Sequence, residues 1–200
     1  LILLTDNGST EEDLPSYRMA EVFDLQMAVI DHHHPDTVVD RFLVGHVNPY
    51  HVGGDFGITS GMLGTEVARL INPGIEPVIR HLPAVAAVGD RSEAPERKRY
   101  LELVKDFCTE EECKDMALAL DYEQFWLRFN DGRELVKEIL NLTSNPERHR
   151  KLITTLVEGA NNLIEDQMNA CMPHVKKRIL QNGAQLFLID VEIHAHKFTF

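Results

Sequence analysis

The first half of the chain alternates short apolar runs with polar turns. Leu1–Leu4 and Met27–Ile30 are continuous apolar runs, closed by the turn residues of Thr5–Gly8 and Asp31–Pro35. Continuous apolar runs of this length predict strands buried on both faces of a parallel sheet. The segment Val38–Val47, halted by an Asn-Pro pair, predicts a third strand.

Helices are predicted between and after these strands. A capping-box pattern at Thr10–Asp13 begins a helix that we expect to run to about Asp24. A glycine-rich loop at 53–57 precedes an apolar-periodic helix from about Ile58 to Ile71. Strands that alternate with helices imply right-handed crossovers, so the fold class is α/β, a parallel sheet flanked by helices.

The second half is predicted to be largely helical. A second capping box, made by Thr109 and Glu112, precedes a helix over Cys113–Phe129. Asn145 starts a helix that would hold about 34 residues if it ran to Leu180. Pro173 is expected to kink this helix. Strand character returns over 184–191.

Composition and charge narrow the class of protein. The chain has 200 residues, 44% of them hydrophobic and 26% charged, which is typical of a globular protein. Its 20 basic and 32 acidic residues give a net charge of −12, which argues against nucleic-acid binding through a general basic surface. Residues 1–90 hold 13 acids, four arginines and no lysine, for a net charge of −9. The change in composition and charge after residue 90 predicts a boundary near residue 91. We expect the divisions 1–92, 93–182 and 183–200.

Other features bear on the setting of the protein. No apolar run is long enough to span a membrane, and we expect no membrane partner. The three cysteines, Cys108, Cys113 and Cys171, form no metal-binding pair, so we expect buried thiols and a reducing cytoplasm. Because the chain begins and ends in apparent strands, we expect it to be part of a longer protein.

Chemistry-bearing residues gather at the predicted strand ends. Asp6 follows the first strand, and Asp31, His32 and His33 follow the second. In parallel sheets ligands bind at the carboxyl ends of the strands. Carboxylates with imidazoles suit Mg²⁺, Mn²⁺, Fe²⁺ or Zn²⁺. On spacing alone, a polar surface loop is an equal alternative.

Four motifs in order make the pattern more specific. The segment 29–33 (Val-Ile-Asp-His-His) resembles the signature of the DHH phosphoesterases, and 3–9 resembles that family's preceding aspartate strand. His46–Pro49 with the glycine loop resembles its Asn-Pro and glycine segments, and Ala86–Asp90 its later aspartate motif. The resemblance covers about residues 1–92 and is greatest to the archaeal RecJ-like members.

The resemblance implies roles for these residues. Asp6 would bridge two divalent ions, Mn²⁺ or Mg²⁺, and His32 and Asp90 would complete one ion site. His33 would contact the substrate phosphate as the catalytic residue, and Asp31 would orient an imidazole from behind. The family's His-x-Asp-x-Asp motif and its C-terminal substrate-binding domain are not in this sequence, so we expect the chain alone to hold at most one ion properly.

Two functions are implied by the resemblance. The first is a metal-dependent phosphoesterase that hydrolyses single-stranded DNA, RNA or short oligonucleotides by two-metal activation of water. Within the enzyme class, a pyrophosphatase or mononucleotide phosphatase is a further possibility. The second function is a non-catalytic scaffold in a replication or repair complex. The helix from Asn145 could then pack on a protein partner or on a second copy.

The remaining histidines receive plainer interpretations. His34, His46 and His51 lie near the expected site, but polar histidines are common in loops. His194 and His196 share one face of a predicted strand. Without a third ligand, we interpret them as a surface pair.

Overall fold

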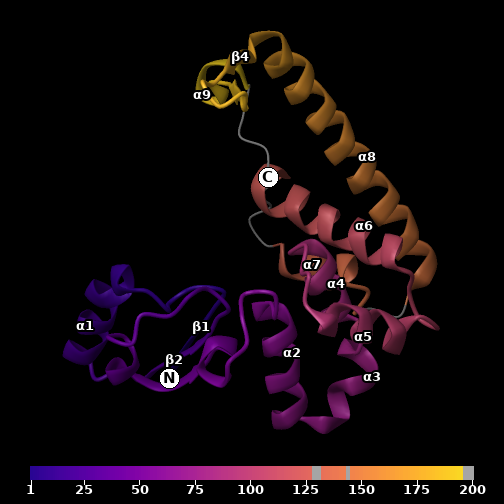
Figure 1. The fold of residues 1–200 in the computed structure, drawn as a ribbon. Helices are drawn as coiled ribbons and strands as arrows, with labels where there is room; N and C mark the ends of the chain where they lie inside the picture. The colour runs from indigo at the N-terminus through magenta and orange to yellow at the C-terminus, as the bar shows by residue number, and fades with distance from the viewer. Residues whose placement is uncertain (128–131, 143–144, 196–200) are drawn as a thin grey trace. The chain divides into compact units, whose positions relative to one another are not determined.

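The computed structural model describes residues 1–127, 132–142 and 145–195. Figure 1 labels the helices and strands along the chain. The chain divides into two compact units, Leu1–Ala117 and Leu118–Phe200. The predicted boundary near residue 91 lies inside the first unit, and the predicted division into domains stays a prediction. His196 lies outside the described residues, so the proposed surface pair with His194 is not described.

The first unit combines a parallel sheet with a group of helices. Its elements are β1 (Ile2–Thr5), α1 (Leu14–Val22), β2 (Met27–Ile30), β3 (Leu43–Val47), α2 (Ser60–Ile71), α3 (Glu76–Ile79), α4 (Leu82–Gly89) and α5 (Pro95–Val104), and α6 (Glu110–Asp121) begins in it. The three strands are parallel in the order β1-β2-β3. The predicted fold class is therefore confirmed.

The core of the sheet lies between its strands and α1. Tyr17 of α1 is completely buried and packs with Val29 of β2 and with Val39. Its hydroxyl donates a hydrogen bond to the carbonyl of Gly8. This bond links α1 to the loop that follows β1, and it fixes that loop against the core.

Three details of the prediction were wrong. The first strand is not buried on both faces: Ile2 and Leu3 are 40% and 52% exposed, because β1 is an edge strand in this sheet. The predicted third strand starts later, at Leu43, after a 3₁₀ turn over Asp40–Phe42. The helix from Thr10 starts with a 3₁₀ turn and ends at Val22.

The second unit is organised around one long helix. The end of α6 is followed by a π-helical segment (Tyr122–Leu127), α7 (Arg133–Ile139), α8 (Pro146–Cys171), the hairpin β4–β5 (Lys176–Ile179 and Gln185–Leu188) and α9 (Val191–His194). No helix in the described parts of the chain is long and apolar enough to cross a bilayer.

The helix α8 begins as predicted but does not reach Leu180. Asn145 caps it by accepting from the backbone N–H of Arg148 at 3.1 Å. Its buried positions include Ile153, Leu156 and Leu163, spaced as one face of a helix. A 3₁₀ turn that contains Pro173 ends it, because proline lacks the N–H that a continuing helix needs.

Candidate metal centre

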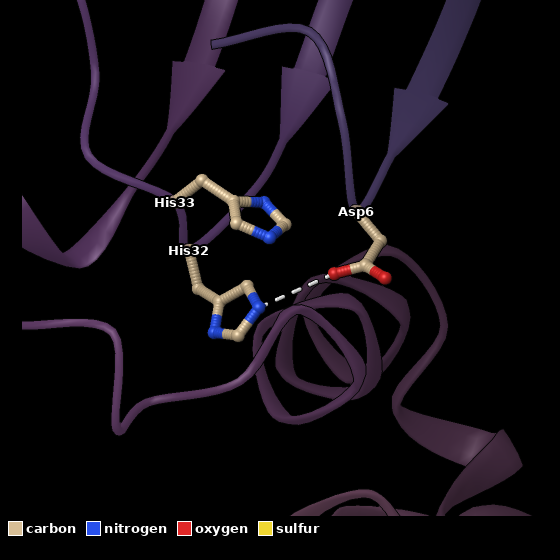
Figure 2. A group of neighbouring side chains, drawn as sticks. All are labelled: Asp6, His32 and His33. Atoms are coloured by element: carbon tan, nitrogen blue, oxygen red, sulfur yellow. Dashed lines mark ion pairs between the residues drawn. The ribbon is translucent and has the colours of Figure 1, made fainter. Parts of the chain in front are cut away.

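The candidate site lies at the carboxyl edge of the sheet. The backbone N–H of Asp6 donates to the carbonyl of Ile30 at 2.9 Å, and that of Asp31 donates to Val47 at 3.0 Å. The ladder of the sheet thus continues into the first residue after β1 and after β2. Figure 2 shows the side chains of Asp6, His32 and His33 facing one another beyond the strand ends.

Asp6 has an unusual backbone conformation. Its φ is +63°, in the left-handed region that side-chain-bearing residues rarely occupy. Aspartate tolerates this region better than most residues. The turn allows the carboxylate to face the residues that follow β2. Backbone conformations of this kind are concentrated at functional sites.

Asp31 is the buried anchor of the site. Only 1% exposed, its Oδ1 faces the backbone N–H groups of His32 (2.8 Å) and His33 (3.3 Å) and the Nδ1 of His33 (2.7 Å). Burial alone would raise the pKa of Asp31, but hydrogen bonds from Ser9 and from both histidines outweigh burial and lower the pKa. The carboxylate is therefore ionised at neutral pH.

His32 presents one ring nitrogen to two carboxylates. Its Nδ1 lies 2.7 Å from the carbonyl oxygen of Phe56, which can only accept, so Nδ1 carries a proton. Its Nε2 lies 3.4 Å from Asp6 Oδ1 and 3.6 Å from Asp90 Oδ2. In a neutral imidazole this Nε2 carries no proton, and its lone pair faces two carboxylates. The arrangement is stable only with a cation or a proton among these three atoms.

Asp90 reaches the site from a helix end. It is the residue directly after α4 and is the C-cap of that helix, where the helix dipole is negative. Burial raises the pKa of Asp90; His32 lowers it, and the nearby Asp6 carboxylate raises it further. A divalent cation would relieve this crowding of negative charge.

His33 points outward from the same loop. Its side chain is 56% exposed, and its Nδ1 pairs with Asp31. The backbone carbonyl of His33 accepts a hydrogen bond from the side-chain amide of Asn48 at 3.0 Å, and Asn48 follows β3. Both ends of the residue are thereby fixed, and Nε2 is directed away from Asp31.

The structure brings all the predicted site residues together. The ligand atoms of Asp6, His32 and His33 lie within 4.8 Å of one another, and Asp90 closes the group through His32. Two carboxylates with imidazole nitrogen match the donors used by Mn²⁺, Fe²⁺ and Zn²⁺, so the residues fit a divalent ion. The separate ion-ligand and phosphate-contact roles of these residues stay predictions.

Two supporting residues were missed by the sequence analysis. The carbonyl of Phe56 sets the tautomer of His32, and Ser9, completely buried, bonds with the ring of His46 at 2.9 Å. A carbonyl leaves no signal in side-chain type, so Phe56 could not be found. Ser9 lies in the motif that contains Asp6, which was the only available hint.

Comparison with known proteins extends this picture. No family model matches the chain. The solved structure of the DHH domain of PF0399, a member of the s1p family of ribosomal proteins, superposes on the whole chain with a TM-score of 0.93 and 43% identity.

The chain has the fold of a DHH domain. It covers 48% of that solved DHH chain. It is also 43% identical, over its whole length, to the uncharacterized protein MJ1198 of Methanocaldococcus jannaschii, of which it spans 29%. The resemblance to DHH proteins is therefore confirmed. Since the chain spans less than a third of the curated relative, the activity and partners of the whole protein are proposals.

Proposed function

We propose that this DHH chain belongs to a metal-dependent phosphoesterase that hydrolyses phosphodiester bonds in single-stranded nucleic acid or short oligonucleotides. The observation that carries the proposal is the orientation of His32. Its protonated nitrogen is held by Phe56, while its other nitrogen faces the carboxylates of Asp6 and Asp90. Such an imidazole is oriented for a metal ion.

The chain's residues divide the work of phosphate hydrolysis. Asp6, His32 and Asp90 would hold divalent ions, Mn²⁺ or Mg²⁺. When bound, such ions activate water and neutralise the charge of phosphoryl oxygens. Ligand atoms of Asp6 and His33 also lie within 4.8 Å of each other, so the carboxylate of Asp6 could bridge to a second ion. The ligands that complete that second ion would come from the rest of the protein.

His33 is suited to bind the phosphate. The carboxylate of Asp31, ionised because of its lowered pKa, lies 2.7 Å from Nδ1 of His33 and orients the ring with Nε2 directed away from it. A protonated His33 would donate from Nε2–H to a phosphoryl oxygen, in a charge-assisted hydrogen bond. Asp31 touches no substrate and acts by orienting His33.

Acidity and phosphate chemistry are compatible here. The net charge of −9 on residues 1–90 would repel a nucleic acid if nothing offset it. Bound divalent cations would offset part of the charge and supply the positive potential at the one place where phosphate reacts. RNA is the first nucleic acid to test, because the similar DHH domain of PF0399 is described as a member of a family of ribosomal proteins.

The test uses the full-length protein that contains this chain. Hydrolysis of end-labelled single-stranded RNA and DNA is measured with Mn²⁺, with Mg²⁺ and after chelation, for wild type, Asp6→Asn and His32→Gln. We expect hydrolysis with the ions, none after chelation, and a loss of at least about 10²-fold in either variant. The exposed Glu21→Gln is the matched control. Wild-type rates in Asp6→Asn would overturn the proposal.

The alternative is a non-catalytic scaffold in a replication or repair complex. It differs in one observable, because a scaffold needs no ion at Asp6 and His32. Failure of the wild-type protein to hydrolyse any nucleic acid, together with no Mn²⁺ binding at these residues, would favour the scaffold.

A further inference from the structure

A second cluster of potential metal ligands lies at the start and end of β3. Asp40 belongs to the turn before this strand, His46 to the strand itself and His51 to the 3₁₀ turn after it (Pro49–Val52). One ligand atom of each lies within 4.8 Å of the others. No residue of this cluster belongs to the centre at Asp6 and His32.

His46 is the fixed member of the cluster. Its side chain is 6% exposed, with Nδ1 at 2.7 Å from Asp40 Oδ1 and Nε2 at 2.9 Å from the buried hydroxyl of Ser9. The ring of His51 stands edge-on to it, with centroids 4.6 Å apart and planes at 89°. Asp40 and His51 are exposed, so their side chains can adjust around the rigid imidazole.

The position of His51 is also set by the fold. Asn48 caps the 3₁₀ turn by accepting from the backbone N–H of Tyr50 at 3.1 Å, and the backbone N–H of His51 donates to the carbonyl of Asn48 at 3.2 Å. The turn folds His51 back over the end of β3. Two imidazoles that are five residues apart in the chain thereby meet beside one carboxylate.

We propose that Asp40, His46 and His51 form a second divalent-cation site, of the zinc class and separate from the centre at Asp6 and His32. Two imidazoles and one carboxylate, with a fourth position open to water, are a known ligand set for zinc. Ligands of a tetrahedral ion with bonds of about 2.0–2.1 Å are closer together than 4.8 Å. Small rotations of the two exposed side chains bring them to that spacing.

A buried atom behind the cluster supports this assignment. Among the described residues, the buried Oδ2 of Asp31 has no hydrogen-bond partner at normal distance and angle, although the hydroxyl of Ser9 is close enough to lower the pKa of that carboxylate. With Nδ1–H of a neutral His46 donated to Asp40, Nε2 of His46 is an acceptor for the Ser9 hydroxyl. The side-chain amide of Asn48 donates to Ser9 at 3.3 Å, so the single hydroxyl proton of Ser9 is shared between His46 and Asp31.

A cation on Nδ1 of His46 reverses the direction of this chain of hydrogen bonds. The proton of His46 then lies on Nε2 and is donated to Ser9, as metal-bound histidines donate their other nitrogen to a neighbouring acceptor. The Ser9 hydroxyl is released to donate to Asp31 Oδ2. Every polar atom in the series from Asp40 to Asp31 then has a partner. Occupancy of the second site would therefore change the hydrogen bonding of Asp31, the residue that orients His33.

The test measures zinc binding and does not depend on hydrolysis. The full-length protein carrying Asp6→Asn and His32→Gln, which disable the first centre, is stripped of metal and titrated with Zn²⁺ against a chromophoric chelator. His51→Gln is compared in this background with His34→Gln. His34 is exposed, lies against Tyr50 and belongs to neither cluster.

We expect the His34→Gln protein to keep its zinc and the His51→Gln protein to bind it at least about tenfold more weakly, a change of about 1.4 kcal/mol. Asp40→Asn should weaken binding as well. Equal zinc affinity in the His51→Gln and His34→Gln proteins would overturn the site. Because zinc binding is read in a protein without the first centre, failure of the proposed hydrolysis leaves this result interpretable.

Discussion

The Nδ1 atom of His32 lies 2.7 Å from the carbonyl oxygen of Phe56, although the two residues are far apart in the chain. This contact determines which nitrogen of the ring carries the proton and therefore what the other nitrogen can do. When Nδ1 is the protonated nitrogen of a neutral ring, the lone pair of Nε2 is directed at Asp6 and Asp90. The candidate metal centre thus depends on the glycine loop as much as on the strand ends.

Asp31→Asn should reduce turnover without removing the ions. Asparagine keeps the volume but loses the carboxylate that orients His33 through its Nδ1. We expect kcat to fall about 10–100-fold, the range for residues that support a functional group from behind. The number of ions bound per chain, measured by mass spectrometry of the metal, should not change. A normal kcat, or loss of the ions, would contradict the positioning role.

The raised pKa of Asp90 predicts a pH-dependent effect of Mn²⁺ on stability. Without metal, the folded protein binds this proton more tightly than the unfolded chain does, so Asp90 contributes stability below its unfolded pKa and loses it as pH rises through the raised value. A cation takes the place of the proton above that pH. At about 100 times its Kd, such a ligand adds about 2.7 kcal/mol.

Thermal unfolding with and without Mn²⁺, from pH 4.5 to 8, checks this expectation. The increase in Tm caused by Mn²⁺ should be largest at neutral pH and should shrink as the pH falls toward the raised pKa of Asp90. In Asp90→Asn the increase should be smaller throughout. An increase that is equal at all these pH values would count against Asp90 as an ion ligand.

A pair of glycines on α2 offers a matched test of how Asp90 is held. A Cβ on Gly61 would lie 2.5 Å from the Cβ of Ala86 on α4, whereas a Cβ on Gly64 would meet nothing within 4 Å. Gly61→Ala should therefore cost about 1–3 kcal/mol through overpacking. Gly64→Ala should stabilise by about 0.5–1 kcal/mol through helix propensity.

Because Asp90 directly follows α4, Gly61→Ala should also weaken Mn²⁺ binding. Chemical denaturation and a Mn²⁺ titration of the two variants check both effects. If Gly61→Ala is as stable as Gly64→Ala, the close packing of α2 on α4 is not as described.

Gly8 is expected to be equally intolerant of a side chain. Its φ is +100°, and a Cβ there would lie 2.6 Å from the hydroxyl of the buried Tyr17. Gly53 has a φ of +82° but open space around it, so it isolates the cost of backbone conformation, about 1 kcal/mol. Denaturation of the two alanine variants should show a larger loss for Gly8→Ala. Equal losses of stability in the two variants would mean that the side chain of Tyr17 moves aside at little cost.

The sequence was informative where local pattern decides the structure. The apolar runs that end at Leu4 and Ile30 located the strand ends to within one residue, and with them the positions of Asp6 and Asp31 to His33. Interactions between distant segments could not be read in this way. The exposure of Leu3 depends on β1 having one neighbouring strand in this sheet.

The second histidine cluster shows the same limit. His46 and His51 were interpreted as ordinary polar loop residues, because the sequence does not reveal that a 3₁₀ turn folds one onto the other. The end of α8 was predicted more nearly, since Pro173 was expected to interrupt the helix by kinking it. Whether proline kinks or ends a helix depends on the structure of the residues after it, and here a hairpin begins at Lys176.

The most direct test of the central claim is anomalous diffraction at the manganese edge from crystals of the full-length protein grown with Mn²⁺. The account predicts a peak bounded by carboxylate oxygens of Asp6 and Asp90 and by Nε2 of His32, and no such peak in His32→Gln crystals. An Mn²⁺-saturated wild-type crystal without density at these three side chains would contradict it.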